Sequence, residues 1–239
     1  MESKVERING TKYIDLRKYL KDIKQWDINY GVKHSPRFDH IMFFTRYKLY
    51  MDSVSNYKIG SATYDGICYP GERIAVVEAR GLFWTAFSAA HELGHNLGAE
   101  HDDMKKGSDL CDPKNNFIMG ANIPETTLFM SSRNPWLFSN CSVKAFLETL
   151  DERDCVHIPG EPYDPHEYQL HLSQKPGVVY NVTEQCRLIV GRYSDICKTT
   201  RRQFTAACGE KGDAEILTRA TYLLPHATVV FSLIGYLMD

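Results

Sequence analysis

The sequence lacks the features of nucleic-acid-binding and membrane-spanning proteins. Its 28 basic and 30 acidic residues give a formal net charge of -2, so no basic field points to nucleic acid or to an anionic membrane surface. It also has no apolar run of about 20 residues, the length that a transmembrane helix needs. The apolar stretch 227–238 is too short to span a bilayer. Membrane attachment is therefore not expected, although a lipid-anchor signal in this stretch stays open.

An export signal is missing as well. Residues 1–10 are polar and charged and contain no apolar stretch resembling a signal-peptide core. The cysteines, by contrast, favour an oxidising compartment. We therefore expect that the chain begins downstream of the start of its gene product.

No Cys-x-x-Cys pair is present, which argues against a zinc ribbon or a redox motif. The seven cysteines stand at positions 68, 111, 141, 155, 186, 197 and 208. Disulfides in a secreted, extracellular protein are their expected use, and a cytosolic protein with free thiols is the alternative. The sequons at Asn9, Asn140 and Asn181 are then candidate glycosylation sites.

Hydrophobic periodicity predicts an α/β fold in the first two thirds of the chain. Helices are expected over 11–26, 82–97 and 142–150, buried strands over 41–45 and 74–77, and a weaker edge strand over 59–64. Proline and glycine break up the chain after that. We therefore divide it into a main domain, a linker, a small cysteine-bearing module and an apolar tail, over residues 1–158, 159–176, 177–210 and 211–239.

The segment that carries chemistry begins His91-Glu92-Leu93-Gly94-His95 and continues to His101. Two histidines four residues apart on a helix lie on one face, one turn apart, so both imidazoles can reach one tetrahedral ion. Gly98 can adopt the left-handed conformation that often ends a helix, which lets His101 return as the third ligand. The fourth position stays open for water. The spacing therefore predicts a zinc site.

Glu92 is the candidate general base of this site. Zinc lowers the pKa of a bound water to about 7, and a carboxylate next to a ligand histidine can reach that water. It would take a proton as the water attacks a peptide carbonyl and pass it to the leaving amine. Accidental matches to the extended motif number roughly 10⁻⁵ per chain of this composition. The sequence therefore predicts a zinc-dependent metalloendopeptidase.

The extended motif resembles the signature of the metzincin metalloproteases, with Met119 in Asn116-Phe117-Ile118-Met119-Gly120 as the candidate Met-turn. Asp102, directly after the third histidine, resembles the adamalysin/reprolysin branch. The likeness covers roughly residues 8–158 and extends to the segments 38–45, 66–68, 76–78 and 138–142. It implies a three-layer α/β catalytic domain of the metzincin type.

The resemblance also implies several further features of the domain. Disulfides would join Cys68 to Cys155 and Cys111 to Cys141. A calcium ion would bind Asp39 and the carbonyl of Cys155. The substrate would add as an extended strand along one edge and fill a specificity pocket; the residues implied are Ser61, Ala62, Thr63 and Tyr64 for the edge, and Gly120, Ala121, Asn122, Ile123 and Pro124 for the pocket.

The two ends of the chain depart from the family pattern. A family domain opens with a strand, a long helix and a second strand before the helix that we expect at 11–26, and nothing here matches them. We expect an N-terminally incomplete domain whose strand 41–45 has an unpaired edge. Residues 176–208 resemble the start of the disintegrin-like module of thrombospondin-repeat-bearing relatives, and also tails of arthropod salivary and venom metalloproteases. Only three cysteines of that module are present.

These observations lead to one functional hypothesis and one alternative. The hypothesis is a zinc endopeptidase that hydrolyses extracellular proteins. The alternative is a truncated, non-catalytic binding module that engages a cell-surface receptor through its cysteine-rich region. Glu92 discriminates between them, because inactive relatives often lose this glutamate or a ligand histidine, whereas this chain keeps all four residues.

Overall fold

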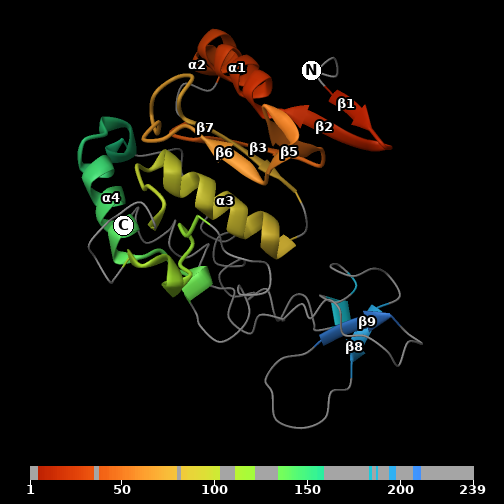
Figure 1. Ribbon diagram of the computed structural model, residues 1–239. Coiled ribbons are helices and arrows are strands. Elements are labelled where there is room, and N and C mark those ends of the chain that lie inside the picture. The colour runs from red at the N-terminus through yellow and green to blue at the C-terminus, as the bar shows by residue number, and fades with distance from the viewer. Residues whose placement is uncertain are drawn as a thin grey trace.

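The computed structural model describes residues 5–34, 38–79, 82–102, 111–121, 134–158, 183–184, 187, 194–197 and 207–210 (Figure 1). Its first part contains β1 (Val5–Ile8), β2 (Thr11–Asp15), α1 (Leu16–Trp26), a π-helical turn (Asp27–Gly31), α2 (Val32–His34), β3 (Ile41–Thr45), β4 (Lys48–Met51), β5 (Ser53–Lys58), β6 (Gly60–Ala62) and β7 (Ile74–Glu78). Then come α3 (Leu82–Asn96), 3₁₀ turns at Pro113–Asn115 and Asn134–Trp136, α4 (Asn140–Asp151), a 3₁₀ turn at Asp154–His157, β8 (Ser194–Cys197) and β9 (Ala207–Glu210).

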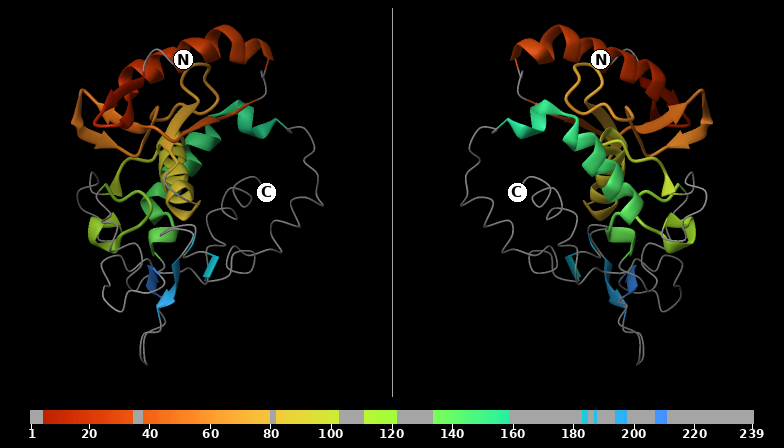
Figure 2. Two further views of the ribbon diagram at one scale, coloured as in Figure 1. Left: turned by 90° about the vertical axis from the view of Figure 1, so that its right-hand side faces the viewer. Right: turned by 90° about the vertical axis from the view of Figure 1, so that its left-hand side faces the viewer.

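The strands of the main domain form two sheets with helices on both sides. One sheet has the order β1-β2-β4-β5 and the other the order β3-β7-β6. Strands β2 and β4 are parallel, as are β3 and β7, while β6 pairs antiparallel with β7. Figures 1 and 2 show α1 on one side of these strands and α3 on the other. This arrangement agrees with the three-layer α/β fold expected from the sequence.

Strand β7 is buried along its whole length, as a strand covered on both faces must be. Ile74 and Val76 belong to a core that also contains Ile14, Leu16, Ile23 and Leu49, from β2, α1 and β4. The second core lies on the side of α3 and α4 and includes Phe87, Ile118, Met119, Trp136 and Phe146. Strand β7 also contacts α3, so it lies between the helices α1 and α3 of the two sides.

The helix expected over 11–26 begins only at Leu16, because residues 11–15 form β2. Asn9 and Gly10 have φ angles of 48° and 79°, the left-handed geometry of a two-residue hairpin turn, and this turn pairs β1 with β2. The Asp15 carboxylate then accepts hydrogen bonds from the backbone N–H groups of Arg17 and Lys18 and caps α1. A hairpin therefore precedes α1, and the expectation that no strand does so was wrong.

The other elements differ from the expected ones mainly at their ends. Helix α4 begins two residues earlier than expected, because the Ser139 hydroxyl accepts a hydrogen bond from the Ser142 N–H and caps it. Strand β6 is shorter than the expected 59–64. Strand β3 has one neighbour, β7, among the described residues, and Phe44 on it is 56% exposed.

The chain beyond residue 158 is described only in short pieces. Strands β8 and β9 pair antiparallel, with Cys197 opposite Ala207 and Cys208 opposite Ile196. The expected linker and the apolar tail lie outside the described residues, as does Cys186. Within the described part of the chain, no helix has the length and apolar character needed to cross a membrane.

Candidate metal centre and substrate cleft

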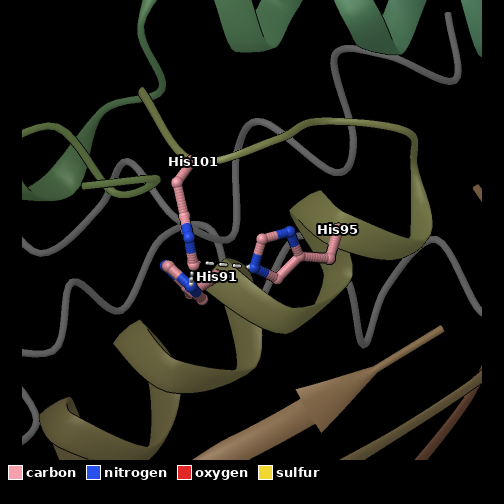
Figure 3. Close-up of side chains that lie close together, drawn as sticks. All are labelled: His91, His95 and His101. Carbon is pink, nitrogen blue, oxygen red and sulfur yellow. Dashed lines mark hydrogen bonds between the residues drawn. The ribbon is translucent and has the colours of Figure 1, made fainter. Parts of the chain in front are cut away.

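Helix α3 and the turn after it bring three histidines together. His91 and His95 lie one turn apart on α3, and Gly98 ends the helical path with a φ of 83°. The chain then reverses and His101 returns to the helix (Figure 3). The Nε2 atom of His101 lies 3.2 Å from that of His91 and 3.1 Å from that of His95. The three nitrogens therefore converge on one point, from a single short segment.

Backbone carbonyls fix how the two helical imidazoles point. His91 Nδ1 donates to the Ile118 carbonyl at 2.7 Å, and His95 Nδ1 donates to the Ala99 carbonyl at 2.8 Å. Because each Nδ1 carries the proton, each Nε2 presents a lone pair to the centre. Burial, together with the nearby His95, lowers the pKa of His91 to about 3. Burial likewise lowers the pKa of His95. Both rings are therefore neutral near pH 7, as metal ligands must be.

The arrangement fits a zinc ion. The Nε2 lone pairs of His91 and His95 face the Nε2 atom of His101, and a cation at the centre would stabilise this arrangement. Tetrahedral zinc with zinc–nitrogen bonds of about 2.0–2.1 Å places its ligand nitrogens roughly 3.3 Å apart, close to the separations found here. All three histidines belong to one cluster of residues able to hold a metal ion. The donor set of three imidazoles is also that of known catalytic zinc sites.

Glu92 lies between this centre and the edge strand β6. Its side chain is 5% exposed, and it accepts a hydrogen bond from the backbone N–H of Ala62. Burial raises the pKa of Glu92 to about 8, although this hydrogen bond and the charge of Lys58 act in the opposite direction. A cation at the histidines would add to these two effects and favour the carboxylate. Glu92 is therefore a buried carboxyl group that can exchange a proton near neutral pH.

Gly60 gives Glu92 the space that it occupies. A Cβ atom at Gly60 would lie 2.7 Å from the Glu92 Oε1 atom and 2.8 Å from its Cγ atom. Any larger residue at the start of β6 would therefore press on the candidate base. Sequence patterns alone could not reveal this contact, because it joins residues that are far apart in the chain.

Met119 lies in a turn that supports the histidines from one side. Its side chain is fully buried, and its sulfur would lie 2.5 Å from a Cβ atom placed at Gly94, between the two helical histidines. The Met119 carbonyl accepts from the Asp102 N–H at 3.0 Å, next to His101. Asp102 in turn accepts from the Ser139 hydroxyl at 2.6 Å, at the start of α4. Met119 and Asp102 thus connect α3, the segment that carries His101 and the start of α4.

A cleft of about 740 Å³ opens over the three histidines. Five of the substrate-binding residues implied by the resemblance line it: Ser61, Ala62, Tyr64, Gly120 and Ala121. Thr63 is not among its lining residues, and its carbonyl instead accepts a hydrogen bond from the Asn96 side chain. Asn122, Ile123 and Pro124 lie outside the described residues. Other residues that line the cleft were not predicted from the histidine motif or the resemblance: Met51, Tyr57, Lys58, Trp84 and Phe87.

The backbone of β6 alternates between the sheet and the cleft. The Ile59 carbonyl and the Thr63 N–H bond to β7. The N–H and C=O groups of Gly60 and Ala62 therefore point away from β7, since hydrogen-bonding directions alternate along a strand. The Ala62 N–H is taken by Glu92, so the Gly60 groups and the Ala62 carbonyl form the strand edge available for backbone pairing with an extended peptide.

Two disulfides fasten the segments around the centre: Cys68 to Cys155 and Cys111 to Cys141. These are the pairs that the resemblance implies. Asp39 lies beside the first of them, and its carbonyl accepts from the Cys68 N–H at 2.9 Å. The Asp39 carboxylate and the two sulfurs are close enough to form a metal-ligating group. The sulfurs are bonded to each other, however, so they are no metal ligands here.

Comparison with known proteins gives the family. A histidine triad on one helix and its following turn, an adjacent buried glutamate and a methionine turn define the metzincin class of zinc metalloproteases. The family model described as Reprolysin (M12B) family zinc metalloprotease matches residues 5–162. The chain therefore belongs to the reprolysin family.

Similar proteins include the human A disintegrin and metalloproteinase with thrombospondin motifs 6, which is 31% identical over 174 residues, covering 70% of this chain and 14% of that protein. The mouse A disintegrin and metalloproteinase with thrombospondin motifs 7 is 30% identical over 218 residues, covering 82% of this chain and 12% of that protein. The chain thus spans only a small part of these curated relatives. Among solved structures, an archaemetzincin from Methanopyrus kandleri matches with a TM-score of 0.41 and 22% identity, over 63% of this chain and 72% of that one.

Proposed function

We propose that this protein is a zinc-dependent endopeptidase that hydrolyses peptide bonds of extracellular proteins. The observation that carries the proposal is the convergence of three imidazoles beside a buried glutamate, at the floor of a cleft with an available strand edge. The match to the reprolysin family supports it. We assign His91, His95 and His101 as metal ligands and Glu92 as the general base.

A zinc ion held by the three imidazoles would supply a Lewis acid that polarises a peptide carbonyl and acidifies water. The residues of the chain supply the rest. Glu92 takes a proton from a water molecule that attacks the carbonyl and delivers it to the leaving amine. Its burial suits this role, because it brings the pKa close to the working pH. The cores behind α3 hold the ligands in place, so little reorganisation is needed during the reaction.

Strand β6 positions the substrate. An extended peptide can pair with the outward backbone groups of Gly60 and with the Ala62 carbonyl, which places its scissile bond beside Glu92. Backbone pairing accepts many sequences, so side-chain pockets must provide selectivity. We assign Ser61, Ala62 and Tyr64 to the strand side of the cleft, and Gly120 and Ala121 to the opposite pocket.

The two disulfides support a secreted, extracellular location, because such bonds persist in oxidising compartments. Glycosylation is also a proposal. Asn9 stands in an exposed hairpin turn, a position that tolerates a glycan. Calcium at Asp39 and receptor contact through the cysteine-rich segment rest on the resemblance alone, and both stay predictions.

The proposal is tested with Glu92→Gln in the full chain, and Glu148→Gln, an exposed glutamate on α4 outside the cleft, is the matched control. Both variants and the wild type are loaded with zinc, assayed for metal content and incubated with an unfolded protein substrate. Glu92→Gln should keep its zinc and lose about 10²-fold to 10⁴-fold in turnover. Glu148→Gln should stay within a few fold of the wild type. Equal turnover of the wild type and Glu92→Gln would refute the assignment of the base.

A further inference from the structure

The cleft contains one cation that the proposed reaction does not need. Of the described residues that line it, Lys58 is the only lysine or arginine. It lies at the end of the cleft where β6 begins, on the wall formed by β4 and β5. The two acidic lining residues are Glu92, at the centre, and Glu100.

The structure holds the backbone at Lys58 firmly. Lys58 is the last residue of β5 and pairs with Leu49 of β4. The next residue, Ile59, accepts a hydrogen bond at 2.8 Å from the N–H of Glu78 on β7. On the other side, the Tyr57 hydroxyl donates to the Glu78 carboxylate. Lys58 therefore sits where both sheets fix the chain, so its side chain starts from a defined position.

The ammonium group of Lys58 has no ion-pair partner within 4 Å among the described residues. The side chain is half-buried and lines the cleft beside Glu92. A cation that lines a cleft and has no ion-pair partner favours an incoming carboxylate and disfavours an incoming cation. Lys58 therefore favours the binding of an acidic side chain at this end of the cleft.

The opposite end of the cleft carries negative charge. Tyr64, just beyond β6, lines the cleft and lies within range of the charge of Glu100, an exposed carboxylate that lines the cleft as well. The cleft is thus positive where β6 begins and negative beyond its end. A peptide that lies along β6 therefore has one end near the positive charge of Lys58 and the other end near the negative charge of Glu100.

The direction of the peptide follows from strand pairing. Antiparallel pairing is slightly more stable per residue than parallel pairing. A peptide antiparallel to β6 places its residues C-terminal to the scissile bond beside Lys58, and its N-terminal residues toward Glu100. An acidic residue therefore meets Lys58 only when it follows the scissile bond.

We propose that Lys58 gives this protein a preference for substrates with aspartate or glutamate on the C-terminal side of the scissile bond. This inference rests on the proposed peptidase function, and it makes Lys58 a specificity-determining residue.

The test uses zinc-loaded full chain and peptides that carry Glu, Gln or Lys at each of the three positions after the scissile bond. A second set carries the same residues before the bond. The wild type should show a Glu-to-Gln ratio of kcat/KM of about threefold to tenfold for at least one position after the bond. Lys58→Met should bring this ratio to about 1, and Lys58→Glu should favour the Lys peptide. Lys144→Glu, on α4 and outside the cleft, makes the same charge change and should leave the ratio unaltered.

Ratios separate specificity from chemistry in this experiment. A change at Lys58 also alters the surroundings of Glu92, but this affects all peptides of a set alike and cancels in the ratio. A second readout avoids turnover altogether: fluorescence anisotropy of labelled peptides with Glu92→Gln should give a lower Kd for the Glu peptide than for the Gln peptide, and salt should reduce the difference.

The outcomes distinguish the two proposals. Cleavage with equal ratios in the wild type and Lys58→Met, or a Glu preference confined to positions before the bond, would overturn the role of Lys58 and leave the peptidase function standing. No cleavage of any peptide would overturn the peptidase function, and the preference with it.

Discussion

Asp27 and Arg73 form a buried ion pair that joins the end of α1 to the start of β7, and removing its negative charge should strongly destabilise the domain. Arg73 Nη2 lies 2.9 Å from Asp27 Oδ1, and Arg73 Nε donates to Oδ2 at 3.1 Å. The Gly71 N–H donates to the same oxygen at 2.7 Å. The side chain of Arg73 is 3% exposed and that of Asp27 is 0% exposed. Asp27→Asn keeps the size of the side chain but leaves the guanidinium buried without its counter-charge.

The loss should be about 3–5 kcal/mol, the usual cost of removing one partner of a buried pair. This is a large part of the about 5–15 kcal/mol by which domains are stable. The assay is urea unfolding of the zinc-loaded chain, followed by tryptophan fluorescence. Arg17→Met is the control, because Arg17 pairs with Asp52 where both side chains are more than half exposed. It should change stability by less than about 0.5 kcal/mol.

The same pair predicts a pH dependence. Burial alone would raise the pKa of Asp27, but the Arg73 guanidinium and the Gly71 N–H outweigh it and hold the pKa below its ordinary value of 3.8. The stability from this group is therefore present above the unfolded pKa and is lost as the pH falls through the folded pKa. The difference between wild type and Asp27→Asn should be constant above about pH 5 and shrink below about pH 4. A loss below 1 kcal/mol that does not change with pH would refute the reasoning.

Three further predictions concern the disulfides, Gly60 and Met119. Replacing both cysteines of a disulfide by serine should lower the free energy of unfolding about 1 kcal/mol more for Cys68–Cys155 than for Cys111–Cys141. The chain-entropy relation gives this difference because the two bonds span 87 and 30 residues. Equal losses in urea unfolding would contradict this. Gly60→Ala should lower kcat at unchanged zinc content, because the new methyl group presses on Glu92; a fall in KM alone would count against the contact. Met119→Ala should lower the free energy of unfolding by about 2–5 kcal/mol and weaken zinc binding. Met119→Leu should lower it by less than about 1.5 kcal/mol. Similar melting temperatures for both variants would show that packing at Gly94 is unimportant.

The histidine cluster could be predicted from the sequence because its geometry is local. His91 and His95 are brought together by the helical repeat alone, and Gly98 supplies the backbone turn that returns His101. All of these residues lie within eleven positions of the chain. No long-range packing is needed to know that such residues can meet.

The hairpin before α1 was missed because two signals competed. The apolar spacing of Ile14, Leu16, Leu20 and Ile23 suits a helix that runs through residue 14. The Asn9–Gly10 turn and the Asp15 cap favour a strand followed by a helix, and the parallel pairing of β2 with β4 decides in favour of the strand. That pairing joins residues more than 30 positions apart, which periodicity within a short window cannot register.

Long-range folding also explains which cleft residues could not be foreseen. Met51, Tyr57 and Lys58 belong to no motif. Tyr57 and Lys58 reach the cleft because β5 leads directly into β6, and Met51 reaches it because β4 pairs with β5. Thr63 was expected on the strand edge that pairs with the substrate, but in the ladder its N–H turns toward β7 and its carbonyl toward Asn96. The side on which a backbone group points depends on the register of pairing, which the resemblance did not specify.

The coordination of zinc in the full chain is the most direct test of the central claim. X-ray absorption spectroscopy of the protein with one equivalent of zinc measures the type, number and distance of the ligand atoms. The account predicts three imidazole nitrogens at about 2.0–2.1 Å and an oxygen from solvent, with one nitrogen lost in His101→Ala. Sulfur ligands, or a zinc environment unchanged by His101→Ala, would contradict it.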